Sequence, residues 1–169
     1  MKALLLSFGL SLVVALCLLQ VSGTWYVKAT ASDKEIPDKK LGSVSVTPMT
    51  IKTLEEGNLE VKFTVLYNGE CLQIDILLEK TEKPGQYSAF WDTNLMYIYE
   101  LPVMDHYIFY SECQIFEQKV YAGELIGRTL ENHEALEEFK KFVQQKGFPP
   151  ENIIVPEQRG KQVTLEITS

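Results

Sequence analysis

Two alternating segments joined by an Asn-Gly pair at residues 68–69 are the feature that most restricts the fold of this chain. Apolar side chains occupy every second position over residues 59–67 and again over residues 72–78. Asn-Gly is the preferred pair for a two-residue hairpin turn, because both residues tolerate the left-handed backbone that this turn needs. The pattern therefore predicts an antiparallel hairpin with one apolar face.

Further strand-like segments flank this hairpin, with turns between them. We expect strands at residues 43–54, 86–90, 95–101, 105–113, 118–128 and, as a short addition, 153–155. One helix follows the strands, with Asn132 as its expected cap, Gly147 at its end, and an apolar face that contains Leu136, Phe139 and Val143. With an N-terminal strand, this order predicts an eight-stranded up-and-down antiparallel β-barrel with one C-terminal α-helix packed outside.

The first residues form a candidate secretory signal. Lys2 precedes an apolar run over residues 3–19, which is typical of a signal peptide. A transmembrane helix is the alternative, but the run is near the short limit for spanning and no basic flank follows it. We therefore expect a signal peptide at residues 1–20, cleaved between 17 and 23, then the barrel and helix over 21–158 and a divergent tail over 159–169. The mature protein is expected to be secreted, without stable membrane insertion.

Charge and residue counts narrow the classes of partner. The net charge is −7 and no basic run is present, so binding to nucleic acid is not expected. The two histidines and three cysteines lack the spacing of a zinc site, so we expect no metal and no cofactor. The histidines also lie in a loop motif and at a helix start, which disfavours a Ser–His–Asp cluster. We therefore expect no catalytic residues, and we expect that the protein is not an enzyme.

Three short motifs resemble the lipocalin family. The Gly-Thr-Trp-Tyr segment that begins at Gly23 is similar to the motif that opens the lipocalin barrel, the Asp-His-Tyr segment at Asp105 is similar to the second motif, and the Gly-Arg pair that ends at Arg128 is similar to the third. The segments over residues 46–49, 57–60, 79–81, 105–110 and 134–139 are most similar to the mammalian tear lipocalin (von Ebner gland) and odorant-binding group. The resemblance implies structural roles for Gly23, Trp25, Asp105 and Arg128, with Trp25 closing the barrel base and Arg128 across its ring.

The resemblance also implies a ligand site inside the barrel, and alternation assigns its lining. The expected ligand-binding residues are Met49, Ile51, Val61, Phe63, Val65, Ile74, Leu95, Tyr97, Tyr99, Tyr107, Phe109, Val120, Ala122 and Glu124. In the first strand, Val27 and Ala29 should share the face of Trp25. A β-bulge in any strand would reverse these faces beyond it.

The function implied by the resemblance is that of a secreted carrier for small hydrophobic molecules such as odorants, pheromones or lipids. The alternative is a cysteine-proteinase inhibitor, or another lipocalin that acts through protein contacts. The expected partners are small hydrophobic ligands and, as a candidate, a cell-surface receptor. We expect a monomer or a weak dimer.

This chain differs from the relatives at Glu124 and in its C-terminal tail. Relatives commonly carry a lysine where this chain has Glu124, whose carboxyl group should face the cavity unless a bulge turns it outward. Relatives also join a cysteine at the Cys71 position to a cysteine in the tail, and residues 159–169 contain none. Alternation places Cys71 on the outer face and Cys113 on the inner face, so these two are expected not to pair.

Overall fold

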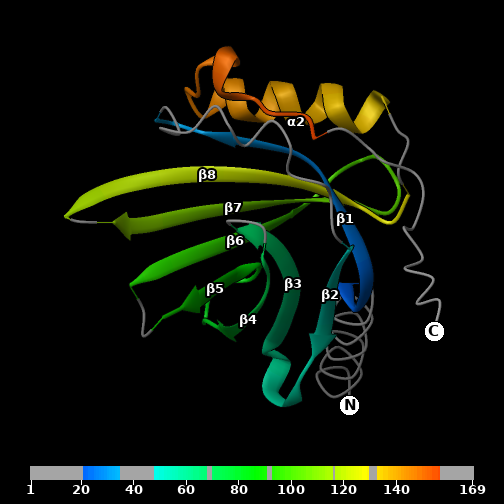
Figure 1. Ribbon diagram of the computed structural model, residues 1–169, viewed down its shortest axis with the longest axis vertical. Helices are drawn as coiled ribbons and strands as arrows, with labels where there is room; N and C mark the ends of the chain where they lie inside the picture. Colours follow the sequence, from blue (N-terminus) through cyan, green and yellow to red (C-terminus); the bar gives the residue numbers. More distant parts are fainter. Residues whose placement is uncertain are drawn as a thin grey trace, which may run out of the picture.

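The strands close into a barrel in the order in which they follow one another along the chain. The computed structural model describes residues 21–34, 48–67, 70–90, 93–115, 117–129 and 133–156. The strands are β1 (Gly23–Ser32), β2 (Pro48–Thr53), β3 (Leu59–Tyr67), β4 (Glu70–Lys80), β5 (Gln86–Ala89), β6 (Asn94–Glu100), β7 (His106–Ile115) and β8 (Gln118–Gly127). Each strand pairs antiparallel with the next, and β8 pairs with β1 (Figure 1). The predicted eight-stranded barrel is confirmed.

The predicted signal peptide and divergent tail lie outside the described residues. Residues 43–47 of the expected second strand also lie outside them, and β2 begins at Pro48. β3 and β4 pair without interruption from Leu59 opposite Leu78 to Tyr67 opposite Glu70, which is the hairpin that the alternation predicted.

The barrel wall separates two apolar clusters. The inner cluster comprises Val21, Trp25, Met49, Ile51, Leu59, Val61, Leu78, Tyr87, Ala89, Tyr107, Phe109 and Ile126. The outer cluster comprises Ala29, Ala31, Val103, Ile108, Tyr110, Leu125, Ala135, Phe139, Val143 and Phe148. Alternate residues of β7 and β8 enter opposite clusters because successive side chains of a strand point to opposite faces. These two strands are therefore apolar on both sides.

The outer cluster is covered by the helix α2 (His133–Gln145), which lies along β8 and β1 (Figure 1). Its end has the geometry of a Schellman motif. Gly147 adopts a φ of 81°, its N–H donates to the Gln144 carbonyl, and the Phe148 N–H donates to the Val143 carbonyl at 3.0 Å. The expected cap, Asn132, lies outside the described residues. Among the described residues, no helix is long and apolar enough to cross a membrane.

The segment after the helix returns to β1. A short 3-10 helix (Pro150–Asn152) follows α2, and Ile154 then forms a single bridge to Thr30 through two backbone hydrogen bonds of 2.8 and 2.9 Å. The strand expected at residues 153–155 is therefore only one bridge long.

A β-bulge in β1 changes the face of one predicted residue. The register with β8 passes from Val27 opposite Ile126 to Ala29 opposite Leu125, so Lys28 is the extra residue. Ala29 consequently packs in the outer cluster, against the helix side of the wall. The prediction that Ala29 shares the inner face of Trp25 is wrong, because alternation is broken at the bulge.

Candidate functional site

Trp25 closes one end of the barrel. Its side chain has no exposed surface, and its Nε1–H donates to the Val21 carbonyl at 2.7 Å. Tyr107 meets it edge to face, with 5.3 Å between ring centres. From the outside, the guanidinium of Arg128 covers the indole, and its Nη2 donates to the Ser22 carbonyl at 2.7 Å. This end of the barrel is therefore filled by side chains.

Two backbone positions hold this plug together. Gly23 has a φ of 123°, and a Cβ at this residue would lie 2.5 Å from Nη1 of Arg128. Both the left-handed backbone and the close guanidinium therefore favour glycine here. Asp105 has a φ of 58°, and its carbonyl accepts a hydrogen bond from the Arg128 N–H at 3.2 Å. The three motifs of the sequence thus meet at one end of the barrel.

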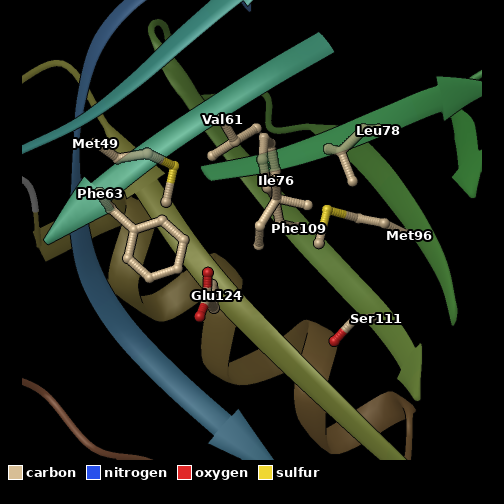
Figure 2. Close-up of a pocket in the computed structure, with 9 residues that line it drawn as sticks. All are labelled: Met49, Val61, Phe63, Ile76, Leu78, Met96, Phe109, Ser111 and Glu124. Atoms are coloured by element: carbon tan, nitrogen blue, oxygen red, sulfur yellow. The ribbon is translucent and has the colours of Figure 1, made fainter. Parts of the chain in front are cut away.

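The barrel encloses a cavity of about 110 Å³. It is lined by Met49, Val61, Phe63, Ile76, Leu78, Met96, Phe109, Ser111 and Glu124 (Figure 2). Seven of these nine side chains are apolar, which suits burial of an apolar ligand with one or two polar anchors. The volume is below the roughly 300–1,000 Å³ of pockets that hold drug-sized ligands. Two of the lining residues are methionines, whose flexible side chains adapt to fill or open space.

The structure sorts the predicted lining residues by depth. Met49, Val61, Phe63, Phe109 and Glu124 line the cavity. Ile51 and Tyr107 pack in the inner cluster with Trp25. The remaining inner-face predictions are placed by register: Ile74 pairs with Phe63, Val120 with Cys113, and Ala122 with Ser111. Val65 belongs to β3, and its side chain lies outside the described part of the structure.

Glu124 is the one ionisable side chain among the nine that line the cavity. Its carboxyl group points into the cavity space (Figure 2). Burial among apolar side chains raises the pKa of Glu124 above its ordinary value of 4.5, because the charged form loses its hydration. The carboxyl group is therefore available to a ligand as a hydrogen-bonding group.

Comparison with known proteins identifies the family of this barrel. The profile described as "Lipocalin / cytosolic fatty-acid binding protein family" matches residues 22–160. The chain belongs to the lipocalin family. The lipocalin is 53% identical over 168 residues to "von Ebner gland protein 1" of Rattus norvegicus, with 94% of this chain and 95% of that protein covered. It is 38% identical over 168 residues to "Odorant-binding protein 2a" of Mus musculus, with 93% and 95% covered.

A solved structure shows the same fold as this lipocalin. The structure described in "The Siderocalin Ex-FABP functions through dual ligand specificities" matches it with a TM-score of 0.73. The match covers 83% of this chain and 97% of the other, at 19% sequence identity. The fold is therefore shared, while the family predicted from the three motifs is confirmed by the profile match and the relatives.

Strand β6 of the lipocalin faces the opposite way from the prediction. Tyr97 packs with the outer cluster, and Tyr99 contacts Phe142 of α2 with 5.1 Å between ring centres. Leu95 shares their face, since it lies two residues before Tyr97. The prediction that these three residues line the cavity is wrong. Both faces of β6 carry apolar side chains, so alternation alone could not distinguish the inner face from the outer one.

Sequence reasoning missed two side chains that line the cavity, Met96 and Leu78. Ile76 and Ser111 also line it, in the registers that alternation gives for Ile74 and Phe109. Met96 enters it from β6, and Ile98 packs against the same inner cluster. These two alternate as regularly as Leu95 and Tyr97, so the signal was present but ambiguous. Leu78 lines the cavity from β4, and it is the last residue of the apolar run over residues 72–78, although it was not predicted to bind ligand.

The histidines of the lipocalin lie away from the cavity. His106 is 2% exposed and hydrogen-bonds to Nζ of Lys28 at 3.1 Å and to the Met104 carbonyl at 2.8 Å. Desolvation lowers the pKa of His106 below 6.5, so the neutral ring accepts from Lys28 through Nε2 and donates to Met104 through Nδ1. His133 is exposed at the start of α2. Within the described ranges, no group of three or more His, Cys, Asp or Glu side chains is placed to hold a metal ion.

Proposed function

We propose that this lipocalin carries small hydrophobic molecules reversibly in its barrel cavity. The observation that carries the proposal is a cavity inside a closed barrel whose lining is apolar at seven of nine positions. The names of its relatives, a von Ebner gland protein and an odorant-binding protein, support the same function. Burial of apolar ligand surface contributes about 25 cal/mol of binding free energy per Å². Part of this gain offsets the translational and rotational entropy that the ligand loses on binding. A small ligand is therefore held reversibly.

The size of the cavity favours compact odorants or pheromones over long lipid chains. A longer ligand requires Met49 and Met96 to change rotamer, which unbranched side chains do at low cost. The N-terminal run over residues 3–19 supports secretion, and we place the function outside the cell. No catalytic step is proposed for the cavity.

The test is displacement of a neutral fluorescent naphthalene probe from the purified mature protein by a panel of odorants. Val61→Trp should fill the cavity and abolish probe binding, because Val61 is 4% exposed and lines it. Lys62→Trp is the matched control, since Lys62 follows in the same strand and its side chain is 40% exposed. Circular dichroism and thermal melts establish that both variants fold, as overpacking costs about 1–3 kcal/mol.

Equal loss of probe binding in both variants, or no binding by the wild type, would overturn the carrier proposal. Inhibition of a papain-type proteinase in the absence of any probe binding would instead favour the inhibitor alternative.

A further inference from the structure

Glu124 occupies a fixed position in the wall of the cavity. It pairs with Phe109 of β7 on one side and with Thr30 of β1 on the other. The β7–β8 register runs unbroken from His106 opposite Gly127 to Ile115 opposite Gln118, so no bulge in β8 turns the carboxyl group outward. The bulge of this region lies in β1, before Thr30.

The carboxyl group of Glu124 has no protein partner in the described part of the chain. No hydrogen bond or ion pair joins it to a described residue, and loss of hydration is the sole cause of its raised pKa. Ser111 is the other polar side chain of the lining, and its hydroxyl donates to the Ala122 carbonyl at 3.5 Å. Glu124 is half-buried, and no fully buried polar side-chain atom of the described residues lacks a partner, so its carboxyl oxygens keep accessible surface toward the cavity. A ligand that donates a hydrogen bond to these oxygens gains free energy that an apolar ligand does not.

Among the described residues, no lysine or arginine lines the cavity. Lys28, the extra residue of the β1 bulge, lies on the outer face of the barrel wall, where it hydrogen-bonds to His106. Lys119 is exposed near the start of β8, and its carbonyl accepts a hydrogen bond from Nζ of Lys34. The Glu124 carboxyl group is thus not neutralised by a lysine from β1 or β8. The acidic residue of β7, Glu112, shares the outer face of Tyr110 and lies away from the cavity.

We infer that Glu124 makes this cavity selective for apolar ligands that carry an amine or a hydroxyl group, and selective against carboxylates. The inference rests on the proposed carrier function and specifies the chemical class of its ligand. An amine or alcohol donates a hydrogen bond to the Glu124 carboxyl oxygen, whether or not that group is ionised. A carboxylate ligand and the Glu124 carboxyl group cannot both be charged in the same low-dielectric space without strong repulsion, so binding of a carboxylate requires one of the two to be neutralised, which weakens it.

The experiment measures the affinities of octylamine, octanol and octanoate at pH 7 by competition with the neutral naphthalene probe. The wild type should bind octylamine and octanol at least tenfold more tightly than octanoate, about 1.4 kcal/mol. Glu124→Lys should raise the octanoate affinity by tenfold or more and lower the octylamine affinity. Glu124→Gln, which keeps the size of the side chain, should reduce the preference for octylamine over octanoate while leaving octanol binding largely unchanged.

The matched control is Glu79→Lys. Glu79 is an exposed residue of β4, and its replacement changes the net charge of −7 by the same amount as Glu124→Lys. Equal gains in octanoate affinity for the two lysine variants would show a general charge effect and overturn the inference. Unchanged headgroup preferences in Glu124→Gln and Glu124→Lys would also overturn it, while leaving the carrier function intact. Failure of every protein to bind the neutral probe would instead overturn the proposed function itself.

Discussion

The guanidinium carbon of Arg128 lies 4.1 Å from the centre of the Trp25 ring, so the end of β8 covers the start of β1. Arg128 also hydrogen-bonds to the Ser22 carbonyl, 106 residues away in the chain. Arg128 is half-buried, so its cation–π contact contributes about 0.5–2 kcal/mol, in addition to the apolar area that the indole buries. This pair therefore closes the base of the barrel at the point where β8 pairs with β1.

Removal of the Trp25 side chain should strongly destabilise the protein. Trp25→Ala leaves a cavity beneath Tyr107 and removes the surface on which Arg128 stacks, so the free energy of unfolding should fall by about 3–5 kcal/mol. Urea denaturation followed by circular dichroism measures this change. Thr24→Ala, at an exposed neighbouring position, should change the stability little. Wild-type stability in Trp25→Ala would contradict the role of the indole as a plug.

His106 should make the folded state less stable in mild acid. Desolvation, with a further contribution from Lys28, lowers the pKa of the folded-state imidazole below 6.5. The unfolded chain therefore takes up a proton first as the pH falls, so the stabilising contribution is present above pH 6.5 and is lost as the pH falls through the folded-state pKa. Denaturation curves between pH 7.5 and pH 5 should show a shallower decline for His106→Gln than for the wild type. His133→Gln, at the exposed start of α2, should retain the wild-type slope.

Glu124 should affect stability in the opposite pH direction. Burial raises its folded-state pKa above 4.5, so its contribution is fully present below pH 4.5 and is lost as the pH rises through the folded-state pKa. Glu124→Gln lacks this titration and should therefore become more stable relative to the wild type as the pH rises from 4.5 to 7. Each unit of difference between the two pKa values corresponds to about 1.4 kcal/mol. Glu79→Gln serves as the exposed control, and a pH-independent difference for Glu124→Gln would place the carboxyl group in solvent.

Cys71 and Cys113 should remain separate thiols in the purified protein. Cys71 is exposed on β4, whereas Cys113 pairs with Val120 and has the register of the inner face of β7. A disulfide requires Cα atoms within about 7 Å and converging Cβ atoms, which opposite faces of the barrel wall prevent. Alkylation under denaturing, non-reducing conditions followed by mass spectrometry should modify both cysteines. A linked peptide that contains both would contradict this arrangement, and under native conditions Cys71 should react faster.

Local sequence patterns were sufficient wherever one face of a strand is polar. In β3 and β4, alternation and an Asn-Gly pair predicted the pairing and the inner face, including Val61 and Phe63. In β8, which is apolar on both faces, alternation with Val120, Ala122 and Ile126 also placed Glu124 in the cavity, and Gly147 marked the end of α2. These inferences depend on interactions within a few residues, and the sequence by itself determines them.

Tertiary structure decided the faces of β6 and of the second half of β1. Tyr97 and Tyr99 are as apolar as an inner face requires, but the end of α2 lies against the outside of β6. Tyr97 packs with the outer cluster there, and Tyr99 contacts Phe142 while remaining 36% exposed. In β1, the extra residue at Lys28 turns Ala29 toward the helix. Hydrophobicity reports that a side chain is buried and not which of two clusters buries it. That choice depends on where a helix distant in sequence packs, and only the assembled barrel determines it.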